Sequence, residues 1–184
     1  MKIVEIFPPN LYSISYDEST EDEEGADEYH RLLYDWMDPE WLVSFFEDHQ
    51  AVMDPAFWGA VTDPEIAAER TLDEAYSLEE TIHELADNTR QGTIPDFDSY
   101  FVPLGGEYAC VWTYMPVKGY GPKKPSLLRL YAIKLETNCY LITGGGVKYC
   151  RTMAESPELS RELNKIERVK SFLKECGIET QEDI

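Results

Sequence analysis

The chain has few residues of the kinds that bind metals or form disulfide frameworks. Its 184 residues include four cysteines and three histidines, and no two cysteines have the CxxC spacing that brings two sulfurs to one metal ion. We therefore expect buried free thiols, no metal site and no cofactor. The three consecutive glycines at 144–146 also lack the spacing of a phosphate-binding loop.

Long apolar segments are absent as well. No run approaches the roughly 20 apolar residues that span a bilayer, and the N-terminus lacks the apolar core of a signal peptide. We expect a cytoplasmic protein without a membrane partner.

Basic residues are scarce over residues 1–117, which contain 4 Lys and Arg against 27 Asp and Glu. Residues 118–174 reverse this balance, with 12 against 5. The net charge of −20 would repel nucleic acid from most of the chain. The basic segment is therefore the part in which nucleic-acid binding is to be sought. Residues 17–28 are so acidic that we expect a solvated loop.

The acidic part of the sequence predicts helices. Four dipeptides place an N-cap acceptor before a proline at the first helical position, namely Asp38-Pro39, Asp54-Pro55, Asp63-Pro64 and Ser156-Pro157. Apolar spacing predicts a helix on each side of the first dipeptide and another over about residues 64–90, ending near Gly92. We expect acids of this last helix, including Glu74, to form its solvated outer face.

The pattern changes to strands from residue 107 onward. Residues 107–115, 127–135 and 139–143 are rich in β-branched or aromatic side chains, and residues 118–126 between the first two predict a basic loop containing Gly and Pro. Residues 2–7 or 11–16 are candidates for a further strand. A helix from Pro157 to about Gly177 follows, with an apolar stripe of Leu159, Leu163, Ile166, Val169 and Leu173.

These elements predict one α+β domain over residues 1–184. Residues 1–100 are its acidic, mainly helical part, and residues 101–184 form an antiparallel sheet closed by an amphipathic helix.

Short motifs in the C-terminal part suggest a family. Pro103-Leu104-Gly105-Gly106, Arg129 with Tyr131, Val147-Lys148 and the helix led by Pro157 follow one another in order. With these motifs, residues 100–175 resemble the core of RelE/HigB-type toxins, the metal-free ribonucleases of toxin–antitoxin pairs. The resemblance implies a RelE-like sheet, RNA or the ribosome as target, and a small antitoxin with a helix-turn-helix as partner.

The resemblance also implies which residues act. Lys148 matches the first lysine of the family's "F-x-K-K" element, and Arg129 matches the arginine of the central strand, so both would stabilise phosphate charge. Tyr149 stands where the second lysine would be, and Arg151 follows in the same segment. These four residues are the predicted catalytic set, which leaves a general acid or base unassigned. Lys118, Lys123 and Lys124 are predicted to bind nucleic acid.

A second interpretation stays open. The lost second lysine and the net charge favour a non-enzymatic protein whose acidic face binds a basic partner or mimics nucleic acid. In this case Arg129 and most of the other cations would pair with acids of the N-terminal helices. An acidic part folded over the basic sheet could also mask it.

Overall fold

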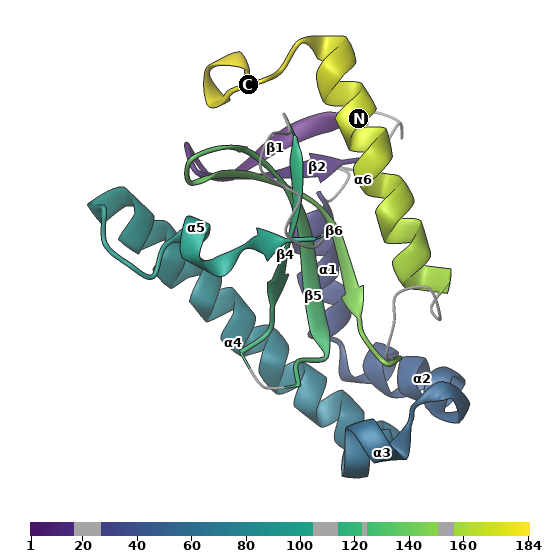
Figure 1. The fold of residues 1–184 in the computed structure, drawn as a ribbon. Coiled ribbons are helices and arrows are strands. Elements are labelled where there is room, and N and C mark those ends of the chain that lie inside the picture. The colour runs from purple at the N-terminus through teal and green to yellow at the C-terminus, as the bar shows by residue number, and fades with distance from the viewer. Residues whose placement is uncertain (17–26, 105–113, 123–124, 151–156) are drawn as a thin grey trace.

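A computed structural model describes residues 1–16, 27–104, 114–122, 125–150 and 157–184 (Figure 1). Its strands are β1 (Lys2–Phe7), β2 (Leu11–Ser15), β3 (Val102–Pro103), β4 (Met115–Tyr120), β5 (Leu128–Glu136) and β6 (Cys139–Val147). Its helices are α1 (Glu28–Trp36), α2 (Pro39–His49), α3 (Pro55–Trp58), α4 (Pro64–Gln91), α5 (Phe97–Tyr100) and α6 (Pro157–Cys176). The predicted α+β class is confirmed.

Local capping signals determine where the helices begin. The side chains of Asp38, Asp54 and Asp63 accept hydrogen bonds from backbone N–H groups in the first turns of α2, α3 and α4. Helix α4 ends at Gly92, whose φ of 66° places it in the left-handed region that favours glycine. These predicted boundaries are confirmed. Helix α6 begins at Pro157 as predicted, although Ser156 lies outside the described residues.

The strands form one six-stranded sheet in the order β1-β2-β6-β5-β4-β3. Neighbours are antiparallel except β2 and β6, which pair in parallel from Leu11 opposite Tyr140 to Ser13 opposite Ile142. The antiparallel sheet predicted for residues 101–184 is therefore confirmed by β3 to β6. Strands β1 and β2, at both of the N-terminal positions considered, extend it to a mixed sheet. Every residue of β2 is buried, as expected for a strand inside a sheet rather than at its edge.

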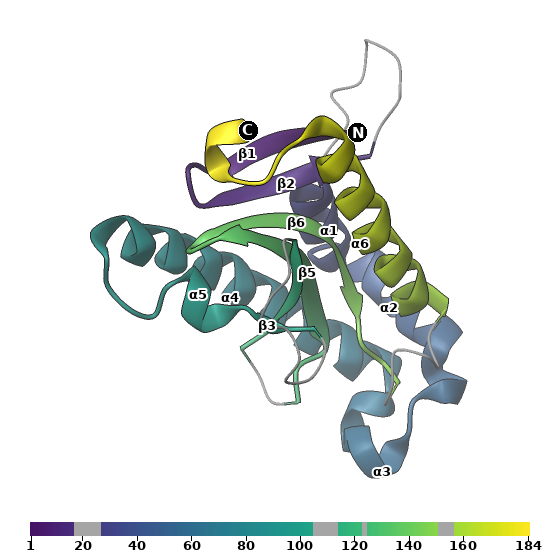
Figure 2. The same cartoon turned by 45° about the horizontal axis from the view of Figure 1, so that its top comes forward.

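The acidic helices and the sheet share one apolar core. In Figures 1 and 2, α1 and α4 lie on one side of the sheet, whereas α6 runs along β6. A Cβ at Gly145 of β6 would lie 2.9 Å from Leu32 and 3.0 Å from Trp36, both in α1. The glycine thus lets this helix approach the strand closely. The core joins Leu32 and Trp36 with Leu130 and Ile142 of the sheet.

The predicted loop over residues 118–126 is wrong at its start, because Lys118, Gly119 and Tyr120 belong to β4. A Cβ at Gly119 would lie 2.3 Å from the ring of Tyr100. The glycine that suggested a loop therefore makes room for an aromatic ring over a strand. The predicted strand over 107–115 falls largely outside the described residues, and Met115 begins β4.

Glu74 of α4 is fully buried. The prediction that it belongs to the solvated outer face of this helix is therefore wrong. Its Oε2 accepts hydrogen bonds from the Ser126 hydroxyl at 2.9 Å and from the Leu127 N–H at 3.0 Å, while its Oε1 accepts one from Arg70 Nε at 3.3 Å. The carboxylate replaces water as the acceptor for a segment that enters β5. Other acids of this helix, including Glu80 and Glu84, are exposed as predicted.

Two further predictions are wrong in detail. Leu163 is 39% exposed, although Ile166, Val169 and Leu173 of the predicted stripe are buried. Glu162 is buried instead, because the Gly145 N–H donates to its Oε2 at 3.0 Å and Lys165 pairs with its Oε1 at 2.9 Å. Among the described cysteines, Cys139 and Cys150 are buried free thiols as expected, whereas Cys176 is exposed.

Candidate cationic site on the sheet

The register of β4, β5 and β6 brings predicted site residues together. Tyr120 lies opposite Arg129, which in turn lies opposite Gly146, and Lys118 lies opposite Tyr131. Because side chains alternate between the two faces of a sheet, these residues share one face. Lys148 follows Gly146 by two positions, and its N–H donates to the Leu127 carbonyl of the neighbouring strand end at 2.6 Å. We call Lys118, Arg129 and Lys148 the cation cluster.

Arg129 is held firmly and is only 8% exposed. Its Nη1 donates to the carbonyl oxygens of Ser126 at 3.0 Å and Leu128 at 2.6 Å. The guanidinium carbon lies 4.3 Å from the ring centroid of Tyr120, which is cation–π geometry. Burial lowers the pKa of Arg129 from its ordinary value, yet a guanidinium stays protonated in proteins. Arg129 is therefore a fixed positive charge with donors besides Nη1.

Lys148 is affected by its cationic neighbours. Burial lowers the pKa of its ammonium group, and the positive charges of Arg129 and Lys118 lower this pKa further. Like charges disfavour the protonated form of a lysine. The ammonium group of Lys148 thus experiences the positive charges of Arg129 and Lys118.

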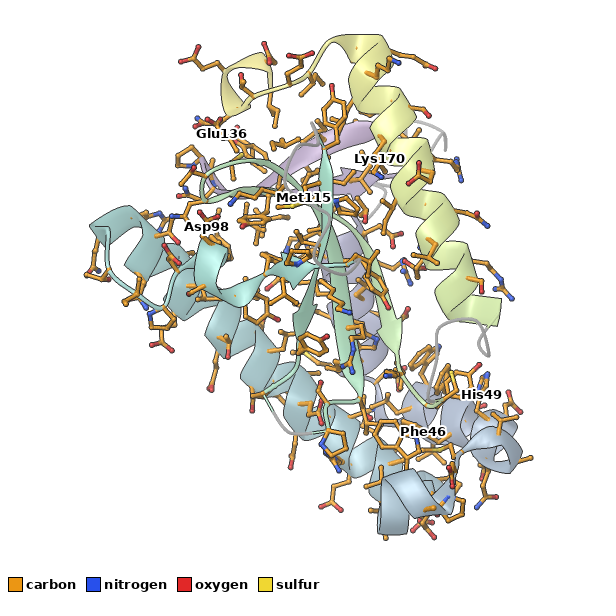
Figure 3. The ribbon with its side chains drawn as sticks, in the orientation of Figure 1. Phe46, His49, Asp98, Met115, Glu136 and Lys170 are labelled. Carbon is orange, nitrogen blue, oxygen red and sulfur yellow. The ribbon has the colours of Figure 1, made fainter. Side chains whose placement is uncertain are left out.

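The cluster differs from Lys134 and Lys165 in lacking an acidic partner at ion-pair distance. Within the part of the chain that the structure describes, no carboxylate oxygen lies within 4.0 Å of a side-chain nitrogen of Lys118, Arg129 or Lys148. Lys134 in contrast pairs with Asp98 of α5 at 2.6 Å (Figure 3), and Lys165 pairs with Glu28 of α1 at 2.9 Å. The acids that the structure describes in residues 1–100 therefore compensate the charges of these two lysines but form no ion pair with the cation cluster.

The other predicted site residues lie elsewhere or outside the described part. Tyr149 is buried, and its ring centroid lies 4.3 Å from that of His49 and 5.7 Å from that of Phe45 in α2. Its carbonyl accepts a hydrogen bond from Trp58 Nε1 at 2.9 Å. The structure therefore brings Arg129 and Lys148 together and places the ring of Tyr149 against α2. Arg151, Lys123 and Lys124 lie outside the described residues.

Tyr120 is the residue at this site that the sequence did not indicate. It is 38% exposed, with Arg129 over its ring and Lys118 Nζ 5.7 Å from its ring centroid. Residues 118–126 are predicted to form a loop, and a loop has no regular alternation of side chains. A strand over residues 115–120 would have predicted that Lys118 and Tyr120 lie on the same face of the sheet.

A pocket lies along β6, between α1, α2 and α6. Its volume is about 340 Å³, and its wall includes Trp41, Phe45, Arg31, Lys165 and the backbone of Gly146. The size suits a small ligand. However, Arg31 pairs with Glu28 and Asp35 at 2.8 Å each, and Lys165 pairs with Glu28 and Glu162. Because these charges are already compensated, this pocket has less capacity for an anion than the cation cluster.

The described residues contain neither a metal-binding group nor a membrane-spanning helix. No group of three or more His, Cys, Asp or Glu side chains there could hold a metal ion. No described helix is both long enough and apolar enough to cross a membrane.

No family model, curated protein or solved structure matches this chain. A functional assignment must therefore rest on the cation cluster together with the sequence motifs.

Proposed function

We propose that the chain is a diverged RelE/HigB-like toxin that binds an RNA phosphodiester at the cation cluster and cleaves it without a metal. The observation that carries the proposal is the lack of carboxylate partners for these three cations among the described residues, in a chain of net charge −20. Like charges brought together disfavour each other's charged forms, and a bound anion relieves this cost. Glu74 compensates Arg129 only in part, because its carboxylate does not form an ion pair with the guanidinium. Gly146, directly opposite Arg129, adds no side chain between Arg129 and Lys148.

The cluster can supply two requirements of RNA cleavage. The 2′-hydroxyl must lose a proton as its oxygen attacks phosphorus, and the neutral amine of Lys148 can accept this proton because the pKa of Lys148 is lowered. Arg129 and Lys118 stabilise the additional negative charge on the phosphoryl oxygens. The bond from phosphorus to the 5′-oxygen then breaks, this oxygen takes a proton from solvent, and a 2′,3′-cyclic phosphate remains.

The first test is growth of a bacterial host after induced expression. We expect the wild type to arrest growth and Lys148→Ala to relieve the arrest, with a loss on the order of 100-fold in cleavage of RNA by the purified protein. Arg129→Ala should act in the same direction. Lys170→Ala removes a cation that pairs with Glu167 at 2.8 Å on α6 (Figure 3) and should remain toxic.

Each variant is compared with the wild type by circular dichroism, so that a misfolded variant is not counted. Arrest by the wild type and by both cluster variants would indicate binding without cleavage. Normal growth together with no cleavage of RNA by the purified wild type would overturn the proposal.

The proposal includes a cytoplasmic location and a small helix-turn-helix antitoxin that neutralises the toxin. A short reading frame for such a protein beside the gene would support this pairing. Co-expression of that protein with the toxin should restore growth.

A non-enzymatic interaction protein is the second candidate. The low exposure of Arg129 favours it, as do the exposed acids Glu80, Glu84 and Asp87 on α4, which offer a surface to a basic partner. If the chain is such an interaction protein, Lys148→Ala should not change the effect of its expression on growth. Charge reversal of the exposed acids on α4 should remove that effect.

A further inference from the structure

The register places Tyr120 of β4 directly opposite Arg129 of β5. The ring is 38% exposed, although Arg129, its partner across the strands, is 8% exposed. The guanidinium is thus covered in part by a ring that itself remains accessible. An accessible aromatic ring next to three cations is the arrangement that binds a nucleobase and its phosphate together.

We propose that Tyr120 is a stacking platform for an unpaired nucleobase beside the phosphate at the cation cluster. This inference rests on the proposed function and extends it to a substrate class, single-stranded nucleic acid. The platform requires a base that has left its helix, because paired bases expose their edges and not their faces. Duplex RNA would therefore bind poorly, although it carries more charge.

The backbone around Tyr120 supports a fixed position for the ring. The Tyr120 carbonyl accepts a hydrogen bond from the Tyr100 hydroxyl at 3.0 Å. The ring of Tyr100 also packs over Gly119, where a Cβ would lie 2.3 Å away. All six residues of β4 have partners in β5. A platform built on a paired strand loses little entropy when a base stacks on it.

Cations near the ring add to this function. Arg129 lies over the ring and Lys118 Nζ lies 5.7 Å from its centroid. Arg129 is then held by Tyr120 as well as by the carbonyls of Ser126 and Leu128. Tyr120 is accordingly a positioning residue for Arg129 and a direct contact for the base.

The test measures binding of three probes to the full chain. They are a single-stranded RNA whose 2′-oxygens are methylated so that it cannot be cleaved, an abasic sugar-phosphate chain of the same length, and duplex RNA. We expect the wild type to bind the single strand roughly 5- to 150-fold more tightly than the abasic chain, the range for one stacked base. Tyr120→Leu should remove this difference while still binding the abasic chain, and Tyr120→Trp should keep it.

Tyr34→Leu is the matched control, since Tyr34 is 77% exposed on α1, and it should bind all three probes as the wild type does. Equal binding of the single strand and the abasic chain by the wild type would overturn the platform while leaving phosphate binding intact. A preference for the single strand that persists in Tyr120→Leu would also overturn it. Failure of the wild type to bind any probe would overturn the proposed function itself.

Discussion

Lys148 differs from Lys134, Lys165 and Lys170 in what surrounds its ammonium group. Each of those three lysines lies within 2.9 Å of a carboxylate oxygen. Lys148 has cations as neighbours, and burial together with Arg129 and Lys118 lowers its pKa. A lowered pKa increases the fraction of neutral amine near pH 7, and only the neutral amine can accept a proton.

The cleavage rate should therefore increase with pH. Below the pKa of Lys148 the amine is protonated and inactive, so the rate should rise with pH, with the midpoint of the rise below 10.5, the ordinary value for lysine. Lys148→Arg keeps the positive charge, but its guanidinium does not deprotonate. We expect this variant to bind uncleavable RNA nearly as well as the wild type and to lose on the order of 100-fold in kcat.

The measurement is kcat and Kd for both proteins across the pH range over which they stay folded. A Lys148→Arg variant with unchanged kcat would show that residue 148 acts through its charge alone. Parallel losses in binding and in kcat would likewise argue against a proton acceptor at this position.

Helix α4 and strand β5 are linked by the carboxylate of Glu74. Its Oε2 accepts from Ser126 and Leu127, the residues that lead into β5, and β5 carries Arg129. The same segment supplies the Ser126 carbonyl that holds the Arg129 guanidinium. Helix α4 therefore supports the position of the cation cluster from the other side of the sheet.

Glu74→Ala should destabilise the protein by about 3 to 5 kcal/mol, because a buried N–H, a hydroxyl and Arg70 all lose their acceptor. Unfolding in urea, followed by circular dichroism, measures this change. Glu80→Ala, at an exposed position of the same helix, should stay within about 0.5 kcal/mol of the wild type. Similar stabilities for the two variants would mean that Glu74 has no structural role.

Elements with local signals could be predicted from the sequence, and those that depend on distant partners could not. The Asp-Pro caps and Gly92 specify helix ends through contacts within a few residues. Glu74 occupies a polar position in a helical pattern, and only the arrival of residues 126–127 makes it buried. The local sequence likewise does not indicate that β2 pairs in parallel with β6, because strand pairing depends on which chain segments meet.

The candidate site was predicted in part for the same reason. Arg129 and Lys148 stand out as cations within or beside apolar strands, and both lie in the motifs that resemble those of RelE/HigB-type toxins. Tyr120 has no signal of its own until β4 and β5 are placed in register.

The acidic and basic parts of the chain are structurally interdependent. Strand β2 from the acidic part pairs with β6, and Trp36 and Leu32 cover β6 at Gly145. The ion pair between Lys165 and Glu28 joins α6 to α1 across the same strand. Removing the acidic part would therefore expose the apolar face of the sheet as well as its charges.

Residues 101–184 expressed alone should not fold, because β6 loses its neighbouring strand and one face of the sheet loses its cover. We expect no cooperative unfolding transition in urea for this fragment, and a transition that appears when residues 1–100 are added. A cooperative transition for the fragment alone would show that the acidic part is an accessory to a self-sufficient sheet.

The pairing of β2 with β6 has a consequence for the order of synthesis. Strand β2 leaves the ribosome about 130 residues before β6 does, a delay of roughly 6.5 to 26 s at 5–20 residues per second. Through this interval β2 has β1 on one side and an unpaired backbone edge on the other. The cation cluster needs β4, β5 and β6 together, so a nascent chain carries no assembled site until β6 has been synthesised.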